Sequence, residues 1–292
     1  MAFSILTDST ANLETALARQ RNIEVLPFSY FVDGKEWQCE NTEEFPCKEY
    51  YDSIRRGTVV TTAQINPQQY MNRMEPLLQA GQDILFIGLS SGISGSFASA
   101  EIARQELLEE YPERSIELVD SMGASLGVGL LALRAAKCRD NGMSLEETAQ
   151  RILNLRSRIY QVFIVDDLMH LRRTGRLSNV GAMVGYVLGI KPLLKGSEEG
   201  KIVAFGKIRG RKQAIRAMAE KYVALAQNAA QQTVGISHAD CEEDARYLME
   251  LLKKNLPPKN FMLVQHEPVT GSHIGPGALA LYFEGDETVR TK

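Results

Sequence analysis

Cysteine is scarce in this sequence, and its placement does not build a site. The four cysteines stand at positions 39, 47, 138 and 241, and no two of them form a CxxC pair. Scattered thiols of this kind are typical of reduced residues in a cytoplasmic protein, not of a disulfide framework. His238, Asp240 and Cys241 are possible metal ligands, but no second pair completes the set. We therefore expect no metal site.

An excess of charge of one sign and a long apolar run are also lacking. Lys and Arg total 33 against 36 for Asp and Glu, so the net charge is −3. A nucleic-acid surface would need a clear basic excess. The most apolar stretch, 180–194, contains Lys191 and Pro192, and no run reaches the ~20 residues of a membrane span. Since Asp8 follows the first apolar residues at once, we expect no signal peptide and a cytoplasmic protein.

The common catalytic motifs are missing as well. The chain has no P-loop, no GxSxG and no HExxH. Ser94 and His273 could still act as nucleophile and base, although Ser94 lacks the nucleophile-elbow spacing and no third residue is indicated.

What the first half does contain is a repeated order of strand, polar loop and helix. Apolar runs at 3–6, 84–89 and 116–119 end in polar loops at 7–10, 90–96 and 120–125, and a helical pattern follows each loop. This alternation predicts an α/β domain with a doubly wound, mostly parallel sheet. Because ligands of such sheets lie beyond the carboxyl ends of the strands, we expect the three loops to share one ligand-binding edge.

The pattern changes near residue 158. Two strands around the turn 197–200, a long helix over 211–230 and further strands at 233–237, 262–267 and 278–283 predict an α+β domain with a mixed or antiparallel sheet. We expect a Rossmann-like domain over 1–157 with a polar excursion near 33–57. A second domain over 158–292 would contribute the loop of His273, and a ligand would lie between or within the two domains.

Three segments could bind a ligand or simply complete the fold. In the loop 90–96, Ser94 or Ser96 is expected to cap the next helix, which leaves N–H groups and the positive end of its dipole for a carboxylate or phosphate. The alternative is a capped turn that binds nothing. Thr61 and Thr62 present the same choice before the helix that contains Pro67. His273 stands in a glycine-rich turn and faces either a cleft or solvent.

Basic residues gather at 172–176 and 207–212. Such a cluster meets a phosphate or an acidic partner, or it forms a solvated face.

Together these segments resemble the DegV family, the fatty-acid-binding proteins of bacterial fatty acid kinase. The matching pieces run in family order along nearly the whole chain: 7–10, Thr61-Thr62, 90–96, Asp120-Ser121, 171–178, 190–192, 207–210 and 273–277. The chain departs from the family pattern at Ala63, where the family often has serine, and at Ser96, where it has threonine.

The resemblance implies that a long-chain fatty acid such as palmitate or stearate is buried in the protein, with no cofactor. By matching position, Thr62 and Ser94 would hydrogen-bond its carboxylate, with His273 close by. The supporting loop residues would be Ser9, Gly95, Ser96, Ser121 and Gly275. Helices at 124–136 and 180–190 could line the tunnel for the acyl chain, or they could be ordinary helix-on-sheet packing.

The resemblance also implies a partner. A separate ATP-binding kinase subunit would phosphorylate the carboxylate, giving an acyl phosphate for phospholipid synthesis, so this chain would itself be non-catalytic. Candidate docking residues are Arg172, Arg173, Arg176 and Arg209. Two other readings stay open: an acyl-ester hydrolase that uses Ser94 and His273, and a regulatory module that acts through the 172–176 face.

Overall fold

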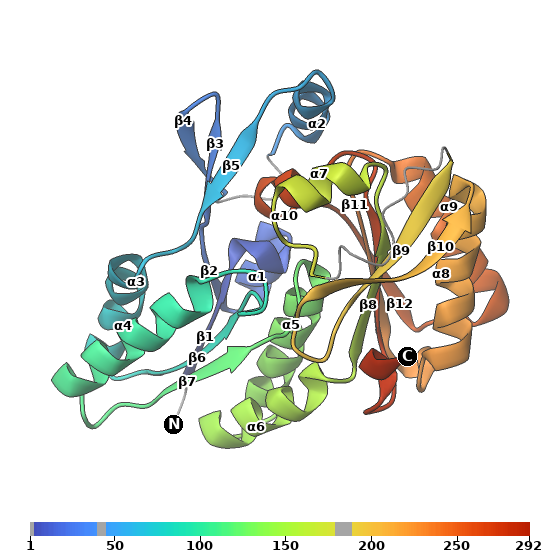
Figure 1. Cartoon of the computed structure of the whole chain (residues 1–292). Helices are drawn as coiled ribbons and strands as arrows, with labels where there is room; N and C mark the ends of the chain where they lie inside the picture. The colour runs from blue at the N-terminus through green and yellow to red at the C-terminus, as the bar shows by residue number, and fades with distance from the viewer. Residues whose placement is uncertain (1–2, 40–44, 179–188) are drawn as a thin grey trace. The chain divides into compact units, whose positions relative to one another are not determined.

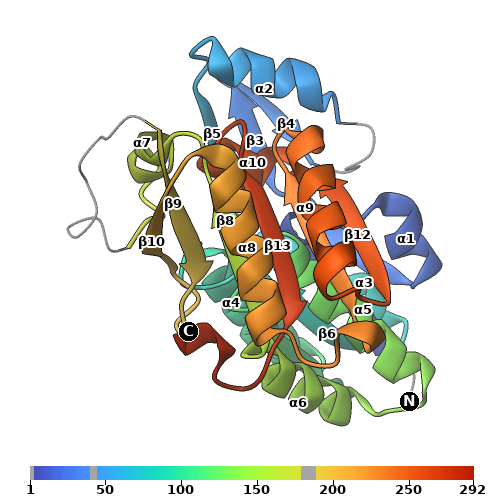
Figure 2. The same ribbon diagram turned by 90° about the vertical axis from the view of Figure 1, so that its right-hand side faces the viewer.

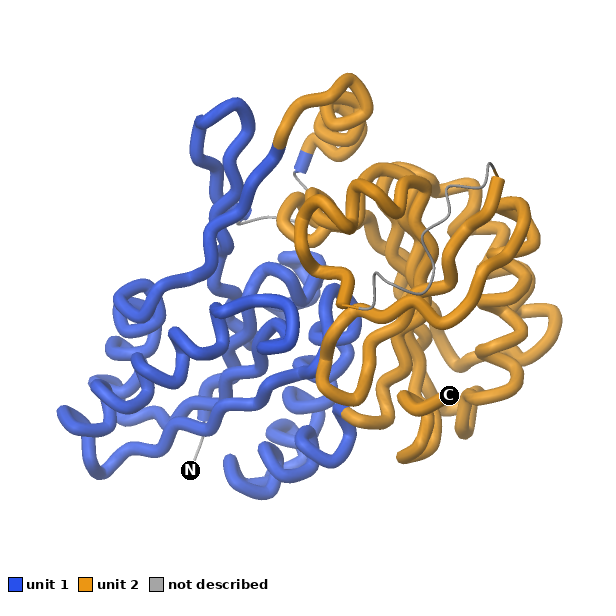
Figure 3. The backbone as a smooth tube through the Cα atoms, viewed as in Figure 1, with its two compact units in different colours: residues 1–45, 60–156 blue, residues 46–59, 157–292 orange. Residues whose placement is uncertain are grey.

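A computed structural model describes residues 3–39, 45–178 and 189–292. The chain divides into two compact units, shown in Figure 3: unit 1 comprises residues 1–45 and 60–156, and unit 2 comprises residues 46–59 and 157–292. Residues 46–59, which the sequence places in the excursion of the first domain, group with unit 2. Whether the two units behave as separate domains stays a prediction.

Unit 1 is built on a parallel sheet with the strand order β2-β1-β6-β7 (Figure 1). Its strands are β1 (Phe3–Asp8), β2 (Ile23–Leu26), β6 (Asp83–Gly88) and β7 (Ile116–Asp120). Its helices are η1 (Ser9–Ala11), α1 (Thr15–Gln20), α3 (Pro67–Gln79), α4 (Ser96–Glu110), α5 (Leu126–Asp140) and α6 (Leu145–Arg156). The predicted parallel sheet is therefore confirmed.

Helices cover both faces of this sheet. The connection from β1 through α1 runs to one side of the sheet and the connection from β6 through α4 to the other, so right-handed crossovers put α1 and α4 on opposite faces. Helix α5 packs on β1 and η1. A Cβ at Gly129 would lie 2.5 Å from the Ala11 carbonyl oxygen, so glycine permits this close approach. The small residues of α5 thus serve helix-on-sheet packing in unit 1.

A separate antiparallel sheet with the order β4-β3-β5 completes unit 1. Its strands are β3 (Ser29–Val32), β4 (Lys35–Gln38) and β5 (Val60–Ala63). The sequence predicts a single strand over 23–31, which is wrong, because the chain leaves the parallel sheet after Leu26 and enters the small sheet at Ser29. Pro27 lies at the break, and proline cannot donate to a sheet ladder. The sequence Asp33-Gly34 predicts a hairpin turn, and this is confirmed, since β3 and β4 pair antiparallel on either side of it and both residues have positive φ.

Unit 2 contains a mixed sheet with the order β10-β9-β8-β13-β11-β12, in which only β11 and β12 pair in parallel among the described strands. Its strands are β8 (Ile159–Ile164), β9 (Ile190–Gly196), β10 (Ile202–Arg209), β11 (Thr233–His238), β12 (Asn260–Gln265) and β13 (Leu279–Glu284). Its helices are α2 (Cys47–Arg55), α7 (Leu168–Arg173), α8 (Arg211–Leu225), η3 (Ala229–Gln231), α9 (Glu242–Asn255), α10 (Pro268–Ile274) and η4 (Val289–Thr291). The mixed sheet is as predicted.

Helices α8 and α9 lie side by side on one face of the mixed sheet (Figure 2). Buried aliphatic residues and the rings of Tyr160, Tyr222 and Phe283 form the core beneath them. Helix α8 ends at Leu225, earlier than the predicted end at 230. The predicted apolar helix at 180–190 falls almost entirely outside the described residues.

Helix α2 packs on α10 within unit 2. The Tyr50 hydroxyl donates to the Pro268 carbonyl at 2.7 Å, and the Tyr51 hydroxyl donates to the His266 carbonyl at 2.9 Å. Because Tyr51 is fully buried, α2 is anchored by buried hydrogen bonds as well as by apolar contact.

Candidate functional site

Three strand ends of unit 1 meet at one edge of the parallel sheet. Thr7 pairs with Ile87, and Gly88 pairs with Asp120, so the loops after β1, β6 and β7 start side by side. The Ser91 hydroxyl donates to the Asp120 carboxylate at 2.6 Å, which joins the second loop to the third. The expectation that these polar loops share an edge is confirmed.

Asp8 joins the first loop to the second. One of its carboxylate oxygens accepts the Leu89 N–H at 2.8 Å, and the other accepts the Thr10 N–H at 2.9 Å. The carboxyl group is fully buried, and burial raises its pKa to about 6 although the hydrogen bonds act in the opposite direction. Asp8 therefore has a structural role, because its side chain joins the loop after β1 to the loop after β6.

The loop 90–96 is folded back on itself by its own backbone. The N–H of Ser94 donates to the Ser90 carbonyl at 3.2 Å, and the Ser94 hydroxyl accepts the Ser96 N–H at 3.2 Å. The N-cap position of α4 is Gly95, which has no side chain, so the predicted position is off by one residue, but the predicted capping hydrogen bond of Ser94 is present because its hydroxyl accepts an N–H of the first turn. Ser94 lies half-buried beside the first turn of α4.

Gln64 connects this loop to the strand that carries Thr62. A Cβ at Gly95 would lie 2.4 Å from Gln64 Oε1, so the Gln64 side chain rests directly on the Gly95 backbone. Gln64 Nε2 also donates to the Ser99 hydroxyl at 3.4 Å. Gln64 is two residues from Thr62 and Gly95 is next to Ser94, so this contact joins the end of β5 to the loop 90–96. We call Thr62, Gln64, Ser94 and Gly95 the hydroxyl corner.

Thr62 itself lies in the middle of β5, directly opposite Tyr30 of β3. It is half-buried, whereas its neighbour Thr61 is exposed. Side chains alternate along a strand, so the two threonines point to opposite faces of the small sheet.

The other predicted supporting residues of unit 1 hold the loops in place. Ser96 is buried and shares a hydrogen bond of 2.8 Å with the Tyr70 hydroxyl. The Ser121 hydroxyl donates to the Gly123 carbonyl at 3.2 Å, and the Ser9 hydroxyl accepts the Phe28 N–H at 3.0 Å. Each of these three serines therefore stabilises the structure of unit 1 through its hydrogen bond.

His273 belongs to unit 2 and lies in the last turn of helix α10, not in the predicted glycine-rich turn. The sequence prediction fails here because Glu267 caps the helix, accepting the Thr270 N–H at 2.8 Å, and Pro268 occupies its first turn. Gly275 ends the helix with φ +81°, a conformation that favours glycine.

The surroundings of His273 keep its ring neutral. Burial lowers the pKa of His273 to about 4, and the nearby Arg176 and His170 act in the same direction. His170 is held by a hydrogen bond of 2.6 Å to the Ser272 carbonyl, and a Cβ at Gly275 would lie 3.0 Å from its ring. At pH 7 His273 therefore offers an N–H donor without a positive charge.

The predicted docking arginines all lie in unit 2. Arg172, Arg173 and Arg209 are exposed, and Arg173 pairs with Asp167 at 3.4 Å. Arg176 is half-buried, and burial lowers its pKa.

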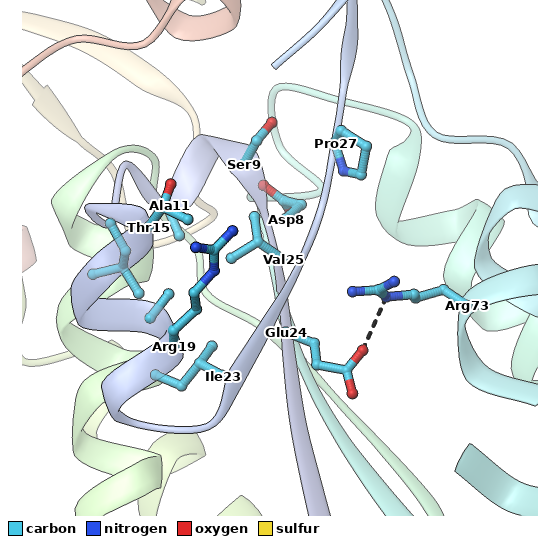
Figure 4. A pocket seen from close by; sticks show the side chains of 12 residues that line it. Asp8, Ser9, Ala11, Thr15, Arg19, Ile23, Glu24, Val25, Pro27 and Arg73 are labelled. Carbon is cyan, nitrogen blue, oxygen red and sulfur yellow. Dashed lines mark ion pairs between the residues drawn. The ribbon is translucent and has the colours of Figure 1, made fainter. Parts of the chain in front are cut away.

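Two cavities lie in unit 1, with volumes of about 460 and about 240 Å³, and Figure 4 shows the larger one. Neither Thr62 nor Ser94 lines them. The predicted tunnel for an acyl chain stays a prediction.

Clusters of metal-ligating side chains and membrane-spanning helices are both missing from the described residues. Nowhere in 3–39, 45–178 and 189–292 do three or more His, Cys, Asp or Glu side chains gather as metal ligands. Within the same ranges, the helices are too short or too polar to span a bilayer.

Reasoning from the sequence assigned no role to Gln64 or Asp8. Gln64 carried a weak signal, because it is only two residues after Thr62. Asp8 stands in the polar loop 7–10, but its hydrogen bond to Leu89, 81 residues away, could not be predicted from local sequence.

The chain is similar to known proteins over nearly its whole length. The model of a family described as "Uncharacterised protein, DegV family" matches residues 2–286. A DegV domain-containing protein of Clostridium perfringens is 35% identical over 284 residues, which cover 97% of this chain and 98% of that protein.

Solved structures are also similar to this chain over nearly its whole length. A DegV family protein of Thermus thermophilus, described by its fatty acid binding, has a TM-score of 0.88 at 29% identity and covers 98% of this chain and 100% of its own. DegV of Bacillus subtilis, described as a fatty acid binding protein, has a TM-score of 0.83 at 30% identity with the same two coverages, 98% and 100%.

Proposed function

This chain belongs to the DegV family, and from that premise we propose that it binds a long-chain fatty acid, burying the acyl chain and presenting the carboxylate. The observation that supports the proposal is the contact of Gln64 with Gly95, which joins the end of β5, the strand of Thr62, to the loop of Ser94. The fatty acid binding described for the relatives from Thermus thermophilus and Bacillus subtilis supports it.

The energetics of such a ligand favour a site with hydroxyl donors. Each buried methylene contributes about 0.8 kcal/mol, so a dozen contribute on the order of 10 kcal/mol before ordering costs. A buried carboxylate without partners would cancel much of that gain. The hydroxyls of Thr62 and Ser94 and the first turn of α4 are the donors that we assign to it.

We assign His273 to the same carboxylate as a neutral donor. With a pKa of about 4, its ring contributes a hydrogen bond but no charge at pH 7. Hydrogen bonds donated to the carboxylate favour its ionised form, which is the form that attacks a phosphoryl group.

The second step that we propose is transfer to a kinase. A separate ATP-binding subunit would phosphorylate the presented carboxylate. The exposed Arg172, Arg173 and Arg209, together with the half-buried Arg176, would dock it. Exposed guanidinium groups suit an acidic partner surface.

A hydrolase that uses Ser94 and His273 is less well supported. A general base works best when its pKa lies near the working pH, whereas burial lowers the pKa of His273 to about 4. The Ser94 hydroxyl already accepts the Ser96 N–H. Both features favour binding over nucleophilic catalysis.

Ligand identification and matched threonine variants test the binding proposal. Organic extraction of the purified protein followed by mass spectrometry should release a C14–C18 fatty acid. In equilibrium binding of radiolabelled palmitate to delipidated protein, Thr62→Ala and Ser94→Ala should each weaken affinity about tenfold or more, as expected for a lost hydrogen bond to a charged group. Thr61→Ala, on the opposite face of the same strand, should bind like the wild type.

Two results would count against the proposal at different levels. A protein that yields no fatty acid and takes up none from a supplied mixture does not have this function. A protein that binds palmitate equally well with alanine at 62 and at 94 has the function but not this carboxylate site.

A further inference from the structure

A short helix of unit 2, α7, packs on α10, the helix that carries His273 (Figure 1). Within α7, the Nε2 atom of His170 lies 2.6 Å from the carbonyl oxygen of Ser272, the residue just before His273. Because a carbonyl group only accepts hydrogen bonds, Nε2 carries the proton and donates it. His170 therefore binds the peptide group that joins Ser272 to His273.

Two further contacts restrain the same turn of α10. The Thr174 hydroxyl lies 3.4 Å from the His273 carbonyl oxygen, and it also donates to the Leu171 carbonyl at 2.8 Å. The His170 ring packs on Gly275, where a Cβ would lie 3.0 Å from the ring atom Cδ2. The segment 170–174 thus contacts the backbone of α10 both before and after His273.

The end of a helix needs such contacts, because the carbonyl groups of its last turn lack partners within the helix. In α10 the Gly271 carbonyl accepts the Gly275 N–H at 2.9 Å, and the Ser272 carbonyl receives its donor from His170. The direction of a helical side chain follows from the backbone that carries it. A backbone fixed at Ser272 therefore limits where the His273 ring can lie.

The same helix also carries the proposed docking residues Arg172 and Arg173, both exposed, whereas His170 is half-buried. The hydrogen bond from His170 thus connects the element that would meet the kinase subunit to the element that carries His273. Both elements belong to unit 2.

We propose that His170 is a positioning residue, which through its hydrogen bond to the Ser272 carbonyl holds the His273 ring in the orientation that donates to the carboxylate of the fatty acid. This inference rests on the proposed function and on the assignment of His273 to that carboxylate. Because His170 acts through His273, its contribution to affinity should exist only while His273 is present.

Two variants of matched side-chain length test the hydrogen bond. Glutamine and methionine are similar in length, but only glutamine has an N–H donor. In equilibrium binding of radiolabelled palmitate to the delipidated full chain, His273→Ala should weaken affinity about tenfold or more and His170→Met about threefold or more. His170→Gln should restore affinity to within about twofold of the wild type. His170→Phe, which keeps a ring beside Gly275 without the donor, should behave like His170→Met and replaces it if methionine disturbs the fold.

A double-mutant cycle separates positioning from a general structural effect. When His273 is already alanine, His170→Met should cause no further loss of affinity, because there is no ring left to orient. An equal loss in both backgrounds overturns the proposal.

NMR of the ligand-free protein gives a second readout. The chain has four histidines, so single substitutions assign their ring Cε1–H signals. The His273 signal should move further from its wild-type position in His170→Met than in His170→Gln. Equal positions in the two variants would contradict the proposed role of the hydrogen bond.

The binding results also distinguish this inference from the proposed function. If the wild type binds no palmitate, the function is wrong and the inference falls with it. If the wild type binds palmitate and His273→Ala does so equally well, the function stands, but both the assignment of His273 and this inference are wrong. If His273→Ala weakens binding and His170→Met does not, or if His170→Gln is as weak as His170→Met, the inference alone is overturned.

Discussion

The buried carboxyl group of Asp8 should make the stability of the folded protein depend on pH. The folded protein raises its pKa from 3.8 to about 6, because burial penalises the charged form. The protonated form is therefore the one that the folded state favours. The stabilisation is fully present below pH 4 and is lost as the pH rises through 6.

Asp8→Asn should remove this pH dependence. The shift corresponds to about 3 kcal/mol, so the variant should gain about that much relative to the wild type between pH 4 and pH 7. At pH 4 the variant should be the less stable protein, because its amide N–H₂ faces the N–H donors of Thr10 or Leu89. Urea unfolding of both proteins at several pH values measures the difference. A difference that stays constant with pH would show that Asp8 does not titrate in this range.

Helix α10 is the element in which the sequence was most misleading. Its segment Gly271-Ser272-His273 resembles a loop because glycine disfavours helices. In the structure Gly271 faces α2, and a Cβ there would lie 2.0 Å from the Tyr51 hydroxyl. The glycine is therefore explained by a side chain 220 positions away, which local sequence patterns cannot reveal.

A double-mutant cycle on Tyr51 and Gly271 should reveal this contact. Gly271→Ala should cost about 1–3 kcal/mol by overpacking, and Tyr51→Phe about 1 kcal/mol by losing its bond to the His266 carbonyl. In the double variant the clashing hydroxyl is absent, so the total should be smaller than the sum by 0.5 kcal/mol or more. Chemical denaturation of the four proteins gives the cycle, and additive costs would mean that α2 does not restrain position 271.

Other elements follow directly from the sequence. Strands β1, β6 and β7 and their polar ends were predictable, because apolar runs with polar termini specify a parallel sheet and the edge at which its polar loops meet. The exact N-cap position of α4 was not, since Ser94 bonds the Ser96 N–H from one position before it. The candidate site residues were named from family resemblance, whereas the role of Gln64 needed coordinates.

At the scale of the whole molecule, substitutions should separate fatty acid binding from phosphorylation of the fatty acid by the proposed kinase subunit. Charge reversal by Arg172→Glu with Arg173→Glu should leave palmitate loading unchanged, because both side chains are exposed and lie outside the hydroxyl corner. If these residues dock the kinase, formation of acyl phosphate by the ATP-binding subunit from the same organism should fall about tenfold or more.

The control is the double variant Lys254→Glu with Lys259→Glu, which changes the charge by the same amount at two exposed lysines elsewhere in unit 2. Equal losses in both double variants would point to a general charge effect and not to a docking surface. Unimpaired acyl phosphate formation by the arginine variant would remove these residues from the interface.

The anchoring of α2 has a consequence for synthesis of the protein. Tyr50 bonds a carbonyl that lies 218 residues further along the chain. At about 5–20 residues per second, a ribosome needs some 10 to 40 s to add that length. Until then the two neighbouring tyrosine rings of a nascent chain lack the surface on which they pack in the folded protein. We therefore expect chaperones to bind this short helix early in synthesis.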